Sequence, residues 1–234
     1  MALPIMTAPR YPVTLPSTGA KYTMRPYLVK EEKALLIALE SQDPEQISLS
    51  VRNIISSCIE DDIDVNDLTV FDIEKLFLEL RAISVGESIS ISGKCTECDE
   101  GTPLIINIKD IELSDLNRDA MVIQLGDDVG LTMKYPTLSI INNIKKDVTS
   151  VEGVMELIIG CIDTIYDSNN VYDAKDEGHE AIENFVESLN SKQFTKIQGF
   201  FGNTPSLSYD LEFECGKCQH ENRLELRGLQ SFFI

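Results

Sequence analysis

The 234-residue chain contains no tryptophan and only two histidines, His179 and His220. Neither histidine lies in a recognisable acid–base arrangement. The sequence also has no phosphate-binding loop, dinucleotide fingerprint, nucleophile elbow or metalloprotease helix. We therefore expect no enzymatic activity, no catalytic residues and no small-molecule substrate.

Positive charge is scarce. The chain has 20 Lys and Arg residues against 39 Asp and Glu residues, which gives a formal net charge of −19. Binding to phosphates requires clustered cations, and no Lys/Arg run here is longer than the pair Lys145-Lys146. We expect no nucleic acid and no anionic membrane among the partners. The acidity either keeps the protein soluble or steers it toward a basic partner surface, and both interpretations stay open.

Long apolar runs are missing as well. No stretch of about 20 apolar residues is present, so no membrane-spanning segment is expected. The start of the chain lacks the basic region and apolar core of a secretory signal. These absences predict a reducing cytosol, where paired cysteines favour metal over disulfides. With 43% hydrophobic and 25% charged residues, the composition is that of an ordinary globular protein with its own core.

The periodicity predicts a helix-rich α+β fold. Residues 1–28 are marked by prolines and are expected to form an extended arm that lies on its own domain or on a neighbour. Residues 29–234 are expected to form a single domain. Helices are predicted at 29–40, 44–59, 70–84, 138–146, 151–166, 180–189 and 193–201. Strands are predicted at 88–92, 104–108, 121–125, 130–134, 207–213 and 223–227, and a loop at 167–178.

Four of the six cysteines form two CxxC pairs, Cys95/Cys98 and Cys215/Cys218. Each pair lies between two alternating patterns, which places it at the tip of a β-hairpin, at about 88–108 and about 207–227. Zinc prefers four such ligands in a tetrahedron. Gly93 precedes the first pair and Gly101 follows it, and Gly216 within the second pair can take turn angles that are costly for other residues. We predict that the two hairpins join in a zinc-ribbon-like site with one structural Zn2+. The 116 residues between the pairs exceed the usual spacing of a ribbon, so the ion would close a long loop.

The cysteines also allow other interpretations. A thioredoxin-type CxxC precedes a helix, whereas strand patterns follow both pairs here. Two disulfides would require an oxidising compartment. Catalytic zinc keeps an open position, which four thiolates do not leave, and His220 is expected to be a bystander. Cys58 and Cys161 occupy apolar helix positions and are expected to be core thiols.

The segment Asp62-Ile63-Asp64-Val65-Asn66 begins like a calcium-binding EF-hand loop. However, Asp67 stands where the loop needs glycine, and Ile73 stands where it needs a bidentate glutamate. We expect an acidic loop that ends at a helix start.

Several stretches within the first 140 or so residues resemble a known family. They are Tyr11-Pro12-Val13-Thr14-Leu15-Pro16-Ser17, Arg25 to Lys33, Phe71 to Ala82, and Met133-Lys134-Tyr135-Pro136. The resemblance is to baseplate hub proteins of T-even-type contractile-tailed bacteriophages. It implies a non-enzymatic hub component or hub assembly factor whose partners are other phage baseplate or tail hub proteins.

The same resemblance implies assembly in the host cytoplasm and a place in the tail baseplate of the virion. Within the Arg25 to Lys33 stretch, the charged residues are expected either to contact partners or to form a solvated helix start. Two rival functions stay open: a zinc-ribbon adaptor or nucleic-acid-binding regulator, and a thiol oxidoreductase.

Overall fold

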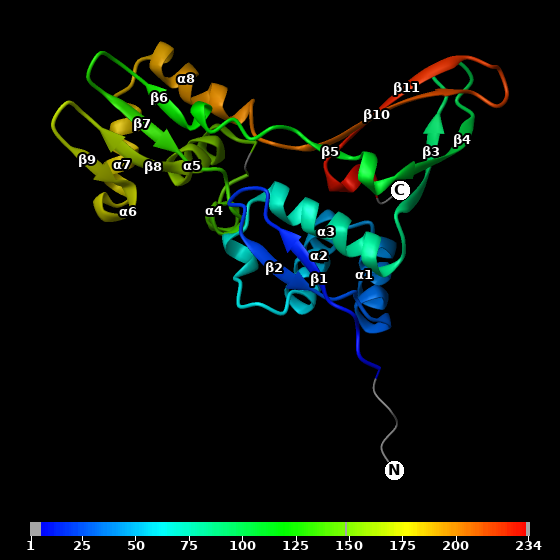
Figure 1. The fold of residues 1–234 in the computed structure, drawn as a ribbon. Coiled ribbons are helices and arrows are strands. Elements are labelled where there is room, and N and C mark those ends of the chain that lie inside the picture. Colours follow the sequence, from blue (N-terminus) through cyan, green and yellow to red (C-terminus); the bar gives the residue numbers. More distant parts are fainter. Residues whose placement is uncertain (1–5, 148, 233–234) are drawn as a thin grey trace. The chain divides into compact units, whose positions relative to one another are not determined.

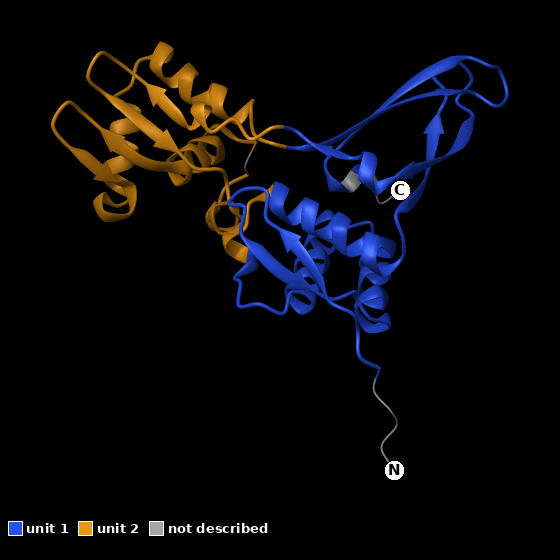
Figure 2. Ribbon diagram, viewed as in Figure 1, with its two compact units in different colours: residues 1–65, 71–114, 206–234 blue, residues 66–70, 115–205 orange. Residues whose placement is uncertain are grey.

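Helices alternate with antiparallel strands along the chain in the computed structural model, which describes residues 6–147 and 149–232. This confirms the predicted α+β class. Contacts divide the chain into two compact units, one from residues 1–65, 71–114 and 206–234, the other from 66–70 and 115–205. Figure 2 shows the two units in different colours. That residues 29–234 behave as a single domain, with 1–28 as an arm, stays a prediction.

Unit 1 contains the helices of the first third of the chain and both cysteine hairpins (Figure 1). Its helices are α1 (Val29–Ser41), α2 (Pro44–Cys58) and α3 (Val70–Ser84, of which Val70 belongs to unit 2). Its strands are β1 (Tyr11–Thr14), β2 (Lys21–Met24), β3 (Ser88–Lys94), β4 (Gly101–Asn107), β5 (Glu112–Leu113), β10 (Leu207–Glu214) and β11 (Glu221–Arg227). Short 3-10 turns lie at η1 (Val65–Asp67), η2 (Ile108–Asp110) and η4 (Leu229–Phe232).

The three helices of unit 1 begin and end close to the predicted positions. Asp43 caps α2, because its carboxylate accepts the backbone N–H of Glu45, and Pro44 occupies the first turn. The apolar side of α3 is buried as its spacing predicted. Its fully buried side chains are Phe71, Leu76, Phe77, Leu78 and Leu80.

The described part of the N-terminal segment forms a small β-hairpin on unit 1. Strands β1 and β2 pair antiparallel, from Tyr11 opposite Met24 to Thr14 opposite Lys21. Val13 is buried, and Met24 is buried beside Ile59, with which it forms an isolated bridge. The described part of this segment thus packs on its own chain.

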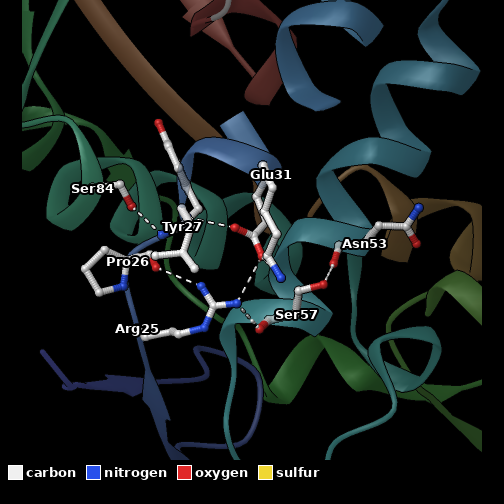
Figure 3. A network of polar contacts seen from close by, with 9 residues as sticks. Arg25, Pro26, Tyr27, Glu31, Asn53, Ser57 and Ser84 are labelled. Atoms are coloured by element: carbon white, nitrogen blue, oxygen red, sulfur yellow. Dashed lines mark hydrogen bonds and ion pairs between the residues drawn. The ribbon is translucent and has the colours of Figure 1, made fainter. Parts of the chain in front are cut away.

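A buried ion pair ties this segment to the helices (Figure 3). The guanidinium of Arg25 lies 3.1 Å from a carboxylate oxygen of Glu31, and it also donates to the backbone carbonyl of Ser57 at 2.8 Å. The other oxygen of Glu31 accepts the backbone N–H of Leu28 at 2.8 Å. Only 7% of Glu31 is exposed, so the expectation of a solvated helix start is wrong for this residue. Arg25 and Glu31 instead hold the chain entry to α1.

The two cysteine hairpins have regular antiparallel register. β3 pairs with β4 from Ser88 opposite Asn107 to Lys94 opposite Gly101. β10 pairs with β11 over the whole of β11, and β5 adds a short third strand beside β10. Alternation in β3 buries its isoleucines and exposes its serines, as the period of two predicted.

Unit 2 is built around a four-stranded antiparallel sheet of order β6-β7-β8-β9. Its strands are β6 (Val122–Gln124), β7 (Gly130–Met133), β8 (Ile162–Tyr166) and β9 (Val171–Asp173). Its helices are α4 (Leu138–Asn143), α5 (Val151–Cys161), α6 (Ala174–Glu177), α7 (His179–Glu187) and α8 (Ser191–Phe201), with a 3-10 turn η3 (Asp119–Met121). The core includes a stack between Tyr135 and Phe200, whose ring centroids lie 5.4 Å apart.

Three predictions in unit 2 were wrong at the level of elements. The helix predicted to reach residue 166 ends at Cys161, and residues 162–166 form β8. The predicted loop at 167–178 contains β9 and α6, and the helix predicted for 138–146 ends at Asn143. A short apolar run fits a buried helix and a buried strand equally well, and here pairing with β7 favours the strand.

Candidate metal centre

The two CxxC pairs lie at the tips of the two hairpins and have the same backbone conformation. In the first loop, Cys95 N–H donates to the carbonyl of Glu100 at 2.9 Å, and Asp99 N–H donates to the carbonyl of Cys95 at 3.1 Å. In the second loop, the corresponding bonds join Cys215 to His220 and Gln219 to Cys215, both at 2.9 Å. Each loop is thus closed by the same two bonds.

The left-handed residue in each loop lies after the second cysteine. Asp99 has φ of 57° and Gln219 has φ of 61°. Gly216, for which the sequence suggested unusual turn angles, is not among the positive-φ residues. The prediction about Gly216 was therefore wrong, because the loop places its one strained position three residues further on.

The four sulfurs form one cluster. All lie within 4.8 Å of one another, with Cys95 Sγ 3.6 Å from Cys218 Sγ and Cys98 Sγ 3.6 Å from Cys215 Sγ. A tetrahedron of thiolates with Zn–S bonds of about 2.3 Å has S···S edges of about 3.8 Å. A disulfide would require about 2.05 Å, and all six cysteines are free. The donor set and its spacing therefore fit a four-coordinate metal ion.

Backbone N–H groups point at the first cysteine of each pair. Burial raises the pKa of the Cys95 thiol, but N–H groups of Cys98 and Glu97 donate to its sulfur, and the pKa falls to about 6. The N–H groups of Cys218 and Lys217 likewise lower the pKa of Cys215. Each loop thereby favours the thiolate of its first cysteine, which is the form that binds metal. The pKa of Cys98 and that of Cys218 are raised, although backbone N–H groups donate to both sulfurs, because the neighbouring cysteine sulfurs disfavour a further negative charge.

Asn222 on β11 joins the two loops, although it was not among the predicted site residues. Its Oδ1 accepts the backbone N–H of Thr96 at 2.9 Å and the Thr96 hydroxyl at 3.0 Å. Its Nδ2 lies 3.6 Å from Cys95 Sγ and 2.9 Å from the carbonyl oxygen of His220. The sequence does contain an indication of this role. Asn222 occupies the inward-facing side of an alternating strand, the same side as Leu224 and Leu226, where a polar amide is unusual.

A close packing contact also joins the hairpins. A Cβ added to Gly93 on β3 would lie 2.7 Å from the ring of Phe213 on β10 and 2.7 Å from Leu104. Phe213 thus occupies the space that a side chain at position 93 would need. Gly93 therefore serves the packing of the two hairpins.

The remaining candidate residues lie outside the cluster. Burial raises the pKa of Cys58 to about 11 and that of Cys161 to about 12, as befits core thiols. The imidazole ring of His220 is not part of the sulfur cluster. The backbone carbonyl of His220 takes part in the second loop, where it accepts the N–H of Cys215. Within residues 6–147 and 149–232, no other group of three or more His, Cys, Asp or Glu side chains comes close enough to share an ion, and the carboxylates of the Asp62–Asn66 segment form no such group.

One further observation bears on the rival oxidoreductase function, and another on membrane-spanning segments. Strands β4 and β11, not helices, follow the CxxC loops, so the helix N-terminus that activates a thioredoxin-type cysteine is missing from both. Among the helices of the described residues, none combines the length and apolar character needed to cross a bilayer.

The fold and the sulfur cluster thus define an α+β protein with a candidate structural metal centre. Comparison with known proteins shows that the chain belongs to the family described as T4 bacteriophage base plate protein, whose model matches residues 8–234. A curated relative is the "Baseplate hub assembly protein gp26" of Enterobacteria phage T4. It is 25% identical over 185 residues, which cover 79% of this chain and 82% of the relative. No solved structure matches.

Proposed function

We propose that this chain is a non-enzymatic component or assembly factor of a phage tail baseplate hub. The observation that carries the proposal is the family match across residues 8–234, supported by a relative whose name describes hub assembly. The protein would act through contacts with other baseplate or tail hub proteins. It would do so in the host cytoplasm during assembly and, if retained, in the tail baseplate of the virion.

We further propose that Cys95, Cys98, Cys215 and Cys218 bind one structural Zn2+ in a zinc-ribbon-like arrangement. The fit between the 3.6 Å sulfur separations and a thiolate tetrahedron supports this assignment. Four protein ligands leave no position for substrate or water, so the ion would supply rigidity. It would join two hairpins whose CxxC pairs are separated by 116 residues of the chain.

The net charge of −19 supports a partner with a basic surface. Charges of one sign raise the rate of encounter with an oppositely charged partner and do so less at high ionic strength. A hub protein with a basic contact surface is the partner we propose.

The assembly role is tested by affinity purification of the tagged full-length chain from infected cells. Co-purification with other tail proteins is the expected result, and lower recovery at high salt would support the basic partner. Finding the chain with neither tails nor assembly intermediates would overturn the role. Comparison of mature virions with hub intermediates distinguishes a permanent component from a factor that leaves.

The metal is tested separately by elemental analysis of protein purified without chelator. We expect one zinc ion per chain. Removal of the ion should abolish protection of β3, β4, β10 and β11 in hydrogen exchange, while helices α1 to α3 stay protected by their own core. A metal-free chain with equally protected hairpins would contradict the zinc assignment and leave the assembly role standing.

A further inference from the structure

Asn222 is the one nearly buried polar side chain that bridges the two cysteine loops among the described residues. It is 6% exposed, and it lies on β11, seven residues after Cys215. Its amide uses both N–H groups and both acceptor positions: two bonds to Thr96, one to the carbonyl of His220, and one to the sulfur of Cys95. Such a fully satisfied amide has a defined orientation, because rotation would break every bond at once.

The four hydrogen bonds of Asn222 are divided between the two hairpins that form the candidate metal centre. One bond, to His220, fixes the amide to its own hairpin, and the other three reach Cys95 and Thr96 of the other hairpin. The side chain therefore holds the loop that carries Cys95 and Cys98 against the loop that carries Cys215 and Cys218. It also donates directly to one of the four sulfurs.

The first hairpin offers a natural comparison. Thr102 stands seven residues after Cys95, the position that corresponds to Asn222, and pairs with Gly93 as Asn222 pairs with Phe213. Its hydroxyl oxygen is buried and has no hydrogen-bond partner in the described part of the chain. Two equivalent positions thus differ: one bridges the loops and the other does not.

We infer that Asn222 is a positioning residue for the four-thiolate centre, which sets the Cys95 loop in place and hydrogen-bonds the Cys95 sulfur. This inference rests on the zinc assignment proposed above. Partners that orient metal ligands in this way contribute to affinity without touching the ion. Asn222 needs no counterpart in the first hairpin, because one amide fixes both loops.

The test uses the full-length chain and Zn2+ in competition with a chromophoric chelator. Asn222→Ala should weaken zinc affinity by about 10- to 100-fold. Thr96→Val removes only the hydroxyl bond and should weaken affinity by about 3- to 10-fold. Thr102→Val is the matched control, since it removes a hydroxyl that bridges nothing, and should bind zinc as the unchanged chain does.

Cobalt substitution supplies a readout that a general loss of stability would not move. A hydrogen bond to a thiolate lowers the energy of its lone pairs, so its removal should shift the sulfur-to-cobalt charge-transfer band of fully loaded Asn222→Ala to longer wavelength. The band should stay in place in Thr102→Val. Wild-type affinity together with an unshifted band in Asn222→Ala would overturn the inference.

The outcomes separate this inference from the function on which it rests. If the unchanged chain binds neither Zn2+ nor Co2+, both the metal centre and the role of Asn222 are refuted. If it binds both, and Asn222→Ala binds them with equal affinity and an unshifted cobalt band, only the role of Asn222 is refuted. Should Asn222→Ala fail to fold, as judged by circular dichroism, Thr96→Val decides, since unchanged affinity in that variant would overturn the inference.

Discussion

The two cysteine hairpins have the same loops and different flanks. Both loops close with the same backbone bonds, and both have their left-handed residue four positions after the first cysteine, at Asp99 and Gln219. The strands beside them differ: Gly93 of the first hairpin corresponds to Phe213 of the second, and Thr102 corresponds to Asn222. The two hairpins therefore match in the loops that carry the cysteines and differ at these positions of the flanking strands.

This difference separates two requirements. Four thiols can surround one ion only if both loops present their sulfurs in the same way, so the loops match. Two hairpins can pack together only if one fills the space that the other leaves, so the flanks differ. The second hairpin supplies the large side chains Phe213 and Asn222, and the first supplies the space at Gly93 and the donors of Thr96.

The largest effect, on zinc content, is expected when a cysteine ligand is lost. This change tests whether the two matching loops bind one ion together. Cys95→Ser and Cys215→Ser each replace the cysteine that receives two backbone N–H donors. Either change should reduce the zinc content from one ion per chain to none, because a neutral hydroxyl replaces a thiolate ligand. Metal content is measured by native mass spectrometry.

Cys58→Ala is the control for this experiment, since it removes a buried thiol on α2 outside the cluster. It should retain zinc while it lowers the stability of the helices. Full zinc occupancy in Cys215→Ser would contradict the assignment, and so would equal loss in Cys58→Ala.

The differing flanks are tested by a double-mutant cycle. Gly93→Ala would push a methyl group into the ring of Phe213 and should destabilise the chain by about 1–3 kcal/mol. Phe213→Ala should cost about 2 kcal/mol, less than for a fully buried phenylalanine, because Phe213 is half-buried. The double variant should be more stable than the sum of the two losses predicts, since Phe213→Ala opens the space that the methyl group needs.

Urea unfolding provides the free energies for this cycle. Gly216→Ala is the control, because a Cβ there meets no atom within 4 Å and its backbone is not left-handed. Strict additivity of Gly93→Ala and Phe213→Ala would show that the two hairpins do not interlock at this point.

Much of the hairpins could be predicted from the sequence, because their signals are local. The period of two in Ser88–Ser92 and Leu207–Phe213 gave the strands, and CxxC between them gave the loops. The four-sulfur cluster followed from ligand number and spacing alone. The contacts of Asn222 and Gly93 did not, because they depend on which residues of the other hairpin, more than 100 positions away, lie opposite.

Unit 2 was harder to predict for a related reason. Ile162 to Tyr166 follows an apolar helix without a break, and only the pairing with β7 and β9 distinguishes strand from helix there. The expectation of a solvated helix start fails at Glu31, because local sequence cannot show that Arg25 folds back onto this residue, whereas Lys30 and Lys33 are exposed. In both places a tertiary contact outweighs the local pattern.

A smaller effect is expected at the base of the second hairpin. Glu74 on α3 accepts the backbone N–H of Leu229 at 2.9 Å, just after β11 ends, and also bonds to the backbone of Leu207, where β10 begins. Burial raises the pKa of Glu74 above its usual 4.5, so the folded chain binds this proton more readily than the unfolded chain. Protonation as the pH falls through that raised pKa therefore removes a cost to stability.

Glu74→Gln keeps the acceptor and removes the charge, so it should be more stable than the unchanged chain at pH 7. The advantage should shrink as the pH falls through the raised pKa and be absent below about pH 4, where the carboxyl is neutral in both states. Chemical unfolding at several pH values measures it, with Glu40→Gln on the exposed side of α1 as the control for net charge. If the difference in unfolding free energy between Glu74→Gln and the unchanged chain does not vary with pH, the raised pKa of Glu74 is contradicted.

The smallest effect is expected for the exposed link between the loops. Lys217 of the second loop lies 2.9 Å from Glu100 of the first, but both side chains are largely in solvent, with 65% and 48% of their surface exposed. Exposed ion pairs contribute little, because water screens them and two long side chains must be ordered. Lys217→Gln should therefore leave zinc affinity and unfolding midpoint unchanged within error at physiological salt, whereas Asn222→Ala lowers the affinity. A loss of affinity in Lys217→Gln equal to that in Asn222→Ala would mean that any bridge suffices and that burial of the amide is irrelevant.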